Sequence, residues 1–168
     1  MARAESNTSQ DTQYFIIVGS KENYEVSKQL GFTIQGLKSR HQKKADLIRP
    51  GDKMVYYLTG GLKVLAGIVT VKSPYVEDYK VIWDCSSSDR KGQQEVYPFR
   101  FQIEPYLIPE DESGFVEVTP IRHEIQYLKK WPEKNWTLGF QGNVHQWPEA
   151  DYRLVEKLFL ERCPAPSC

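Results

Sequence analysis

The sequence contains few features of a secreted or membrane-bound protein. Its three cysteines, Cys85, Cys163 and Cys168, are odd in number and scattered, which does not suggest a disulfide framework. No apolar run approaches the roughly 20 residues that span a bilayer. The polar stretch at residues 1–12 lacks the apolar segment of a signal peptide. We therefore expect a cytoplasmic protein.

An excess of positive charge is also lacking. The 22 Lys and Arg residues balance 22 Asp and Glu residues, so the formal net charge is zero. Nonspecific binding to nucleic acid draws its affinity from counterions displaced at phosphates and favours a basic protein. Any nucleic-acid surface must therefore be a local patch. The densest basic stretch, either such a patch or a solvated face, contains Lys38, Arg40, His41, Lys43 and Lys44.

Motifs of metal, cofactor and phosphate chemistry are missing. The three histidines are isolated from one another, and no metal-ligand spacing or zinc-deaminase signature is present. Gly60-Gly61 is typical of a hairpin turn and not of a phosphate loop. Cys85 lies in a polar loop without a positioned base, which favours a surface thiol over a nucleophile. We expect no cofactor, no metal and no catalytic residue.

Apolar patterning predicts one strand-rich domain with helices around it. At 168 residues the chain is long enough for one core. We expect a disordered leader at 1–12, the domain at 13–162 and a flexible tail at 163–168. The run at 14–18 is apolar throughout, which suits a strand buried on both faces. Strands are predicted at 14–18, 53–59, 64–71 and 96–103, and helices at 22–30, 121–130 and around 154–159.

Several short stretches, in the same order and spacing, resemble the EVE domain. They begin with Tyr14-Phe15-Ile16-Ile17 and Ser20-Lys21-Glu22-Asn23-Tyr24-Glu25, followed by Arg49-Pro50-Gly51-Asp52-Lys53-Met54-Val55-Tyr56-Tyr57. Further matches are Ala66-Gly67-Ile68, Pro74-Tyr75, Tyr97-Pro98-Phe99-Arg100, Trp136 with Phe140 and Gly142, and Glu149-Ala150-Asp151-Tyr152. The resemblance covers residues from about 14 to 159. EVE domains look like members of the PUA-like superfamily, close in architecture to YTH domains.

The resemblance implies an α+β fold, a PUA-like curled mixed β-sheet or barrel flanked by helices, with a pocket for one extruded base. Such a pocket needs flat walls for stacking and polar groups for the base edge. The candidate pocket residues are Ser20, Asn23, Tyr24, Phe32, Tyr57, Trp83 and Trp136. Each has a structural alternative, because aromatic residues often fill cores and Ser20 or Asn23 can cap a helix. Arg100 either contacts a ligand or pairs with an acid such as Glu95 or Glu104.

The implied function is that of a non-catalytic module that recognises a modified base, 5-modified cytosine or N6-methyladenine, in DNA or RNA. Such a module would act with a nuclease or an RNA-processing partner protein. Two other functions stay open on the residues alone. One is an RNA- or nucleoside-modifying enzyme that uses Cys85 or an Asp–His pair, and the other is a small-molecule or protein-interaction module on the same scaffold.

Overall fold

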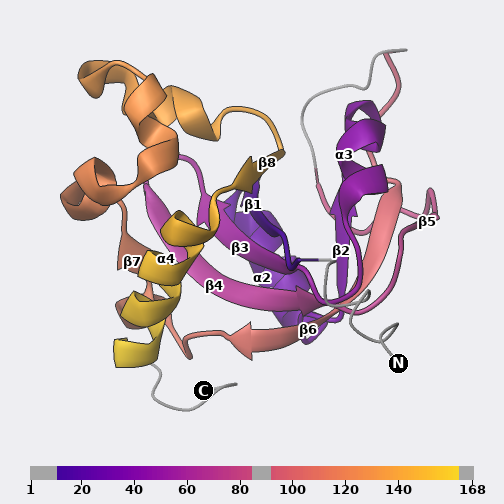
Figure 1. The fold of residues 1–168 in the computed structure, drawn as a ribbon. Helices are drawn as coiled ribbons and strands as arrows, with labels where there is room; N and C mark the ends of the chain where they lie inside the picture. Colours follow the sequence, from indigo (N-terminus) through magenta and orange to yellow (C-terminus); the bar gives the residue numbers. More distant parts are fainter. Residues whose placement is uncertain (1–10, 85–91, 163–168) are drawn as a thin grey trace, which may run out of the picture.

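The computed structural model describes residues 11–84 and 92–162, and a curled mixed sheet with helices on both faces lies at its centre (Figure 1). Its main path runs in the order β2-β6-β4-β3-β1-β8, with β5 beside β6 and β7 beside β4. Strand β1 pairs parallel with β3, and the other pairs are antiparallel. The strands are β1 (Tyr14–Gly19), β2 (Ile34–Leu37), β3 (Lys53–Leu58), β4 (Val64–Val71), β5 (Val76–Glu77), β6 (Phe99–Leu107), β7 (Val116–Glu117) and β8 (Val144–Trp147).

Three α-helices and five short 3-10 helices surround the sheet in the described part of the chain. The α-helices are α2 (Lys21–Gln29), α3 (Gln42–Leu47) and α4 (Glu149–Arg162). The 3-10 helices are η1 (Ser39–His41), η2 (Glu112–Gly114), η3 (Thr119–Glu124), η4 (Gln126–Lys130) and η5 (Glu133–Phe140). This arrangement confirms the α+β class and the curled mixed sheet flanked by helices. No helix among the described residues is long and apolar enough to cross a membrane.

The burial of strand β1 on both faces explains why its sequence is apolar at every position. Phe15 and Ile17 face one hydrophobic cluster, and Tyr14, Ile16 and Val18 face the other. Successive residues of a strand point to opposite faces, so a strand covered on both sides alternates between two cores. Each fully buried side chain of this size stabilises the fold by about 1.5–3 kcal/mol.

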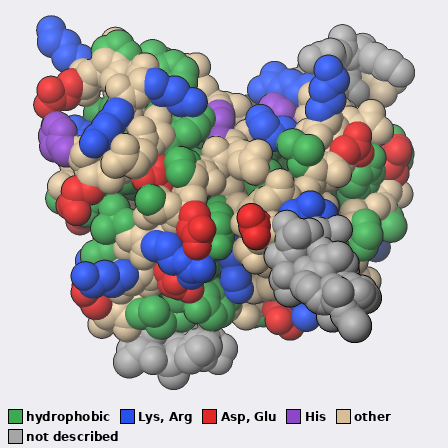
Figure 2. Space-filling model, in the orientation of Figure 1, with side chains coloured by type: hydrophobic (Ala, Val, Ile, Leu, Met, Phe, Trp, Pro, Cys, Tyr) green, Lys and Arg blue, Asp and Glu red, His purple; other side chains and the backbone are tan. Residues whose placement is uncertain are grey.

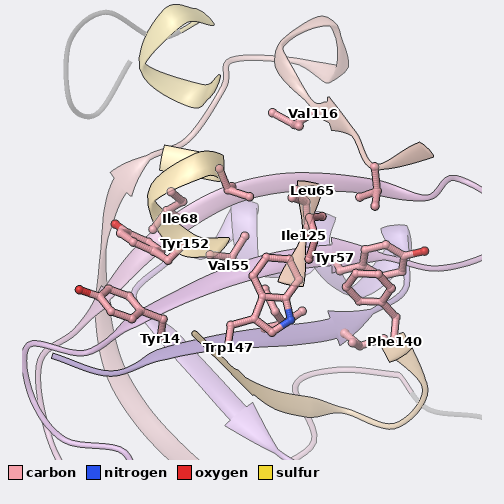
Figure 3. Packing of buried hydrophobic residues seen from close by; sticks show 14 of the residues in the cluster. Tyr14, Val55, Tyr57, Leu65, Ile68, Val116, Ile125, Phe140, Trp147 and Tyr152 are labelled. Atoms are coloured by element: carbon pink, nitrogen blue, oxygen red, sulfur yellow. The ribbon is translucent and has the colours of Figure 1, made fainter. Parts of the chain in front are cut away.

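One core lies between the sheet, α4 and the helical segment η3–η5 (Figure 3). Tyr14 stacks on Tyr152 of α4 with ring centroids 4.3 Å apart, and Tyr57 stacks on Phe140 of η5 at 3.8 Å. The other core contains Tyr24 of α2 and Ala45 of α3. The two faces of the sheet therefore carry separate aromatic clusters.

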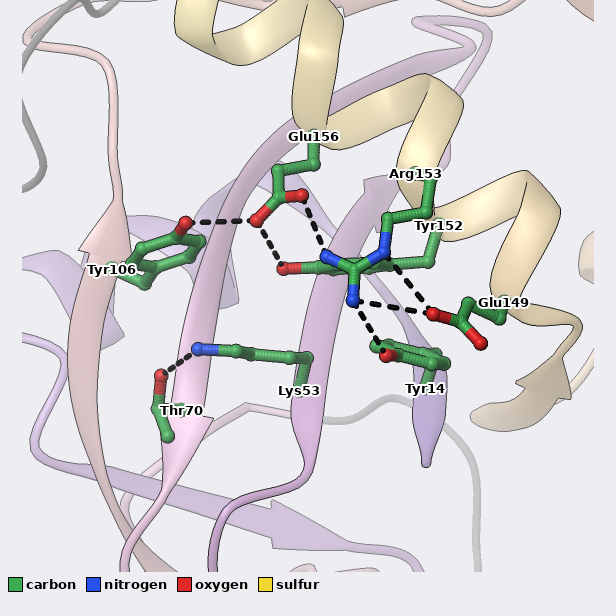
Figure 4. Close-up of polar contacts among 8 residues, drawn as sticks. All are labelled: Tyr14, Lys53, Thr70, Tyr106, Glu149, Tyr152, Arg153 and Glu156. Carbon is green, nitrogen blue, oxygen red and sulfur yellow. Dashed lines mark hydrogen bonds and ion pairs between the residues drawn. The ribbon is translucent and has the colours of Figure 1, made fainter. Parts of the chain in front are cut away.

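A polar network also fastens α4 to the sheet (Figure 4). The Glu156 carboxylate accepts hydrogen bonds from the Tyr106 hydroxyl at 2.8 Å and the Tyr152 hydroxyl at 3.3 Å, and it pairs with Arg153 at 2.9 Å. Arg153 also contacts Glu149 at 3.2 Å and the Tyr14 hydroxyl at 3.4 Å. The network therefore ties the helix to β1 and β6.

The prediction of one continuous helix at 121–130 is wrong. The segment forms two 3-10 helices, η3 and η4, separated at Ile125, whose backbone is extended. The Asp151 carboxylate accepts hydrogen bonds from the backbone N–H groups of Gln126 and Tyr127 at 2.7 and 2.8 Å. Because this side chain from α4 takes those two donors, a continuous α-helical ladder does not form there. The predicted tail at 163–168 and residues 1–10 of the predicted leader lie outside the described residues.

Candidate nucleic-acid interface

A pocket lies where β1 ends and α2 begins. Because β1 and β3 run parallel, their carboxyl ends meet at one edge of the sheet, with Gly19 opposite Leu58. Ser20 caps α2 there, since its Oγ accepts a hydrogen bond from the Asn23 backbone N–H at 3.1 Å. The pocket is lined by Ile17, Val18, Gly19, Ser20, Asn23, Tyr24, Ser27, Gln35, Tyr56, Leu58, Trp83, Tyr97 and Asn143.

The pocket has two steps of very different size. Its inner cavity has a volume of about 30 Å³, and the wider mouth measures about 530 Å³. The two spaces share five lining residues, Val18, Gly19, Ser20, Asn23 and Tyr97. A cavity of the inner size holds a water molecule or a small substituent, whereas the mouth is wide enough for a planar ring.

Trp83 forms one wall of the inner cavity. It is 3% exposed, donates a hydrogen bond from Nε1 to Ser27 Oγ at 3.0 Å, and meets the Tyr97 ring at an interplanar angle of 74°. Gly36 lies against both aromatic residues, since a Cβ there would lie 2.8 Å from the Trp83 ring and 2.5 Å from the Tyr97 carbonyl oxygen. The Trp83 wall therefore depends on a glycine in β2.

Arg100 holds the loops that carry Trp83 and Tyr97. Its buried guanidinium donates to the carbonyl oxygens of Tyr97 at 3.1 Å and Val96 at 2.8 Å, and also to that of Lys80. Its acidic partner is Asp78, at 3.6 Å, and not Glu95 or Glu104 as the sequence suggested. The five donors of a guanidinium suit this contact with several carbonyl groups.

Tyr24 and Tyr56 close the floor of the pocket. The Tyr24 hydroxyl donates to the Ala66 carbonyl at 2.7 Å, and the Tyr56 hydroxyl donates to Gln35 Oε1 at 3.0 Å. Burial raises the pKa of both hydroxyls well above the ordinary value of 10.0. Both tyrosines therefore remain protonated at neutral pH.

The amide side chains of the pocket are already engaged by the backbone. Asn23 pairs with Asp84 through two hydrogen bonds, of 2.6 and 2.9 Å. Asn143 accepts from the Lys38 N–H at 2.9 Å and donates to the Val18 carbonyl at 3.2 Å. These contacts fix the side chains and leave Asn23 and Asn143 further lone pairs or N–H groups for a ligand.

The structure brings together four of the seven predicted pocket residues: Ser20, Asn23, Tyr24 and Trp83. Phe32 is 4% exposed and packs behind Tyr24, with ring centroids 5.3 Å apart, so it does not line the cavity. Tyr57 and Trp136 belong to the opposite core. Tyr57 lies there because it follows Tyr56, and neighbouring strand residues face opposite sides.

Sequence reasoning missed Gln35, Tyr56, Tyr97 and Asn143 as lining residues. Tyr56 was missed because the apolar run of β3 is buried on both faces and gives no phase for its alternation. Asn143 reaches the pocket from a segment 125 residues after Val18, and no local pattern carries that information.

The predicted phosphate-binding stretch extends from the mouth of the pocket along η1 and α3. Lys38 lines the mouth together with the acidic residues Glu22 and Asp84. Arg40 and Lys43 are exposed, and Lys44 is half-buried. The stretch therefore places Lys38 at the mouth of the pocket and its other basic residues along η1 and α3.

Two basic segments approach each other next to β8. Lys44 of α3 and Lys130 of η4 both lie close enough to His145 to lower its pKa, after the larger effect of burial. Burial, with Arg40 and Lys44 nearby, lowers the pKa of His41 to about 4. Figure 2 shows Lys and Arg side chains on both sides of a hollow between α3 and the 3-10 helical segment. Both histidines are neutral at pH 7, so lysine and arginine supply the charge of this surface.

No group of three or more His, Cys, Asp or Glu residues able to hold a metal ion occurs among residues 11–84 and 92–162. Cys85, the nucleophile of the enzyme alternative, lies outside the described residues.

Comparisons with known proteins give close sequence relatives and more distant structural ones. The chain is 31% identical over 157 residues to a UPF0310 protein of Pyrococcus horikoshii, covering 88% of this chain and 99% of the relative. It is 28% identical to a UPF0310 protein of Pyrococcus abyssi, covering 86% of this chain and 98% of the relative. No family model matches the chain.

Two solved structures with a similar fold contain a modified base. One is the YTH domain of Zygosaccharomyces rouxii MRB1 in complex with N6-methyladenosine RNA, with a TM-score of 0.57, 16% identity and coverage of 89% of this chain and 88% of that chain. The other is human THYN1 in complex with 5-methylcytosine containing DNA, with a TM-score of 0.56, 10% identity and coverage of 88% and 98%. The likeness confirms the expected PUA-like, YTH-like architecture.

Proposed function

The chain belongs to the UPF0310 protein family, and we propose that it is a non-catalytic module that recognises one modified base in DNA or RNA. The base ring lies in the mouth of the pocket, and its substituent enters the inner cavity beside Trp83 and Tyr24. The two-step shape of this pocket is the observation that carries the proposal.

The size of the inner cavity favours a small substituent. About 30 Å³ accommodates a methyl or hydroxymethyl group but not a base ring or a sugar. The ring must therefore remain in the mouth, where Glu22 and Asp84 lie within the lining. A carboxylate accepts a hydrogen bond from the exocyclic amino group of cytosine. A 5-modified cytosine keeps both N–H donors of this group, whereas the methyl group of N6-methyladenine replaces one of its two. We therefore place 5-methylcytosine and 5-hydroxymethylcytosine first and N6-methyladenine second.

The chemistry of the inner cavity supports binding and not catalysis. Its described lining has no carboxylate, histidine, lysine or cysteine. Its tyrosines Tyr24 and Tyr56 hold their protons, because burial raises their pKa values. The complexes of THYN1 with 5-methylcytosine containing DNA and of a YTH domain with N6-methyladenosine RNA lend support from proteins of similar fold. A module of this kind would act through a nuclease or an RNA-processing partner protein.

The first test adds one methyl group to the wall of the pocket by substitution of a glycine. Of the eleven glycines, Gly19 alone combines an ordinary φ with open space at the position that a Cβ would take. That Cβ would lie on the same face of β1 as Ile17, which lines the inner cavity. Gly19→Ala should therefore leave folding intact and weaken binding of the modified base by about tenfold, the effect of a clash costing roughly 1.4 kcal/mol.

Binding would be measured by fluorescence anisotropy on short oligonucleotides. The panel compares unmodified cytosine and adenine with 5-methylcytosine, 5-hydroxymethylcytosine and N6-methyladenine, in DNA and RNA, in single and double strands. Tighter binding to one modified base, lost in a folded Gly19→Ala variant, would support the proposal. Equal binding across the panel, or a Gly19→Ala variant that reads the mark as well as wild type, would contradict it. Turnover of a substrate that is abolished by Cys85→Ala would favour the enzyme alternative.

A further inference from the structure

A second groove continues directly from the mouth of the pocket. Its volume is about 570 Å³, and it lies between the β3–β4 turn, at residues 59–63, and the segment at residues 137–142. Val18, Thr59 and Gly142 line both the groove and the mouth. A chain molecule with one unit in the mouth can therefore place its next unit in the groove without leaving the surface.

The groove presents polar groups that have no partner within the described protein. The Tyr57 hydroxyl, at the end of the ring stacked on Phe140, points away from the core cluster (Figure 3) and forms no hydrogen bond to a described residue. Thr137 and Gln141 also line the groove, and their side chains make no hydrogen bond within the same part of the chain. By contrast, the amide groups of Asn23 and Asn143 in the base pocket are engaged by backbone groups.

The charge of the groove differs from that of the mouth. Lys63 lines the groove, and its ammonium lies 5.9 Å from the centroid of the Trp136 ring, on an exposed turn. No carboxylate is among the described residues that line the groove, whereas the mouth carries Glu22 and Asp84 beside Lys38. An anionic group is therefore better placed in the groove than in the mouth.

Hydroxyl, amide and ammonium donors without an opposing acid match the sugar and phosphate of a nucleotide. We propose that this groove binds the sugar and phosphodiester of the nucleotide next to the read base, with Lys63 on the phosphate and the Tyr57 hydroxyl on the sugar or phosphate. The inference rests on the proposed function and extends it, since the protein then recognises a modified dinucleotide unit and not an isolated base.

The test compares free modified nucleosides with dinucleotides that carry the same base. The probes are 5-methyl-2′-deoxycytidine, 5-hydroxymethyl-2′-deoxycytidine and N6-methyladenosine, each free and extended by one nucleotide on the 5′ or the 3′ side, in deoxy and ribo forms. Calorimetry on the full chain would give each affinity. On the correct side, the added nucleotide should strengthen wild-type binding by about tenfold or more, the combined effect of two hydrogen-bonded contacts.

Tyr57→Phe removes the hydroxyl and keeps the ring that stacks on Phe140. It should reduce the gain from the added nucleotide by about 3- to 10-fold and leave the affinity for the free nucleoside unchanged. Lys63→Gln should do the same and, on a single-stranded oligonucleotide, lower the salt slope by about 0.7. Lys157→Gln, a change of the same kind on an exposed residue of α4 that lines neither space, is the control.

Each outcome distinguishes the two levels of the proposal. Loss of the dinucleotide gain in Tyr57→Phe and Lys63→Gln, with nucleoside binding retained, supports the groove. Nucleoside binding with no gain from either neighbour, or with a gain that both variants keep, overturns the groove and leaves the base pocket standing. No binding to any nucleoside, dinucleotide or oligonucleotide overturns the proposed function, and the groove with it.

Discussion

At the scale of single residues, Tyr24 shows how one side chain serves both the core and the pocket. Strand β4 bulges opposite Tyr56 and Tyr57, so that Ala66 has no residue opposite it in β3. The Tyr24 hydroxyl donates a hydrogen bond to the Ala66 carbonyl at 2.7 Å. It thereby gives a partner to a carbonyl group that has none in β3. The ring meanwhile lines the inner cavity.

Tyr24→Phe should lower the free energy of unfolding by about 1–3 kcal/mol, because a buried carbonyl loses its donor. Chemical denaturation monitored by tryptophan fluorescence would measure the change. The matched control is Tyr57→Phe, whose hydroxyl has no partner among the described residues and whose loss should cost far less. Equal stability of the two variants would mean that water replaces the Tyr24 hydroxyl at the bulge.

Residue identity alone could not assign these tyrosines to a role. The sequence favoured Tyr57, and the structure has Tyr56 lining the inner cavity and Tyr57 lining the neighbouring groove. Both lie in an apolar run that is buried on both faces, and such a run gives no phase for its alternation. The prediction for Trp83 used a local signal, the adjoining polar loop, and the structure has Trp83 lining the inner cavity.

At the scale of elements, long periodic segments could be predicted and short ones could not. Strands β1, β3 and β4, helix α2 and the terminal helix α4 all carry clear apolar patterns and occur where they were expected. Strands β2 and β8 have four residues each, too few for a period to be recognised. Their pairing partners, β6 and β1, lie far away in the chain, so their existence depends on tertiary contacts.

The attachment of α4 gives a pH-dependent prediction. Burial acts to raise the pKa of Glu156, but hydrogen bonds from Tyr106 and Arg153 outweigh it and hold the pKa below 4.5. A carboxyl with a lowered pKa stabilises the fold above its unfolded pKa, and this contribution is lost as pH falls through the folded pKa.

Glu156→Gln should therefore destabilise the protein at neutral pH, and the difference from wild type should shrink as pH falls below about 4.5. Thermal unfolding of both proteins across this range would measure it. A difference that stays constant with pH would show that packing, and not the charge, explains the cost of the substitution.

At the scale of the whole molecule, basic side chains gather on one part of the surface although the net charge is zero. The lysines of α3 and those of η4 are separate in the sequence, yet Lys44 and Lys130 both lie close enough to His145 to lower its pKa. The sequence predicted the basic stretch at residues 38–44 but not its convergence with η4, because that convergence depends on tertiary contacts around β8. Figure 2 shows Lys and Arg side chains on both sides of a hollow.

The two histidines of that hollow make the whole fold sensitive to mild acid. Burial lowers the pKa of His41 and of His145 below the ordinary 6.5. The unfolded chain therefore binds more protons than the folded one as pH falls below about 6.5, and stability decreases. Denaturation midpoints between pH 7 and about 4 should fall in wild type and fall less in His41→Gln. If the midpoints of that variant fall with pH as steeply as those of wild type, protonation of His41 does not explain the loss of stability.

Strand β1 pairs with β8, so Tyr14 lies opposite Trp147. During synthesis from the N-terminus, β1 keeps one unpaired edge until β8, more than 120 residues later, has been made. Asn143, which precedes β8, also joins the pocket at that late stage, through Lys38 and Val18. A nascent or truncated chain that ends before this segment lacks part of the pocket. We therefore expect the proposed recognition of a base only in molecules that have been made to the end of β8.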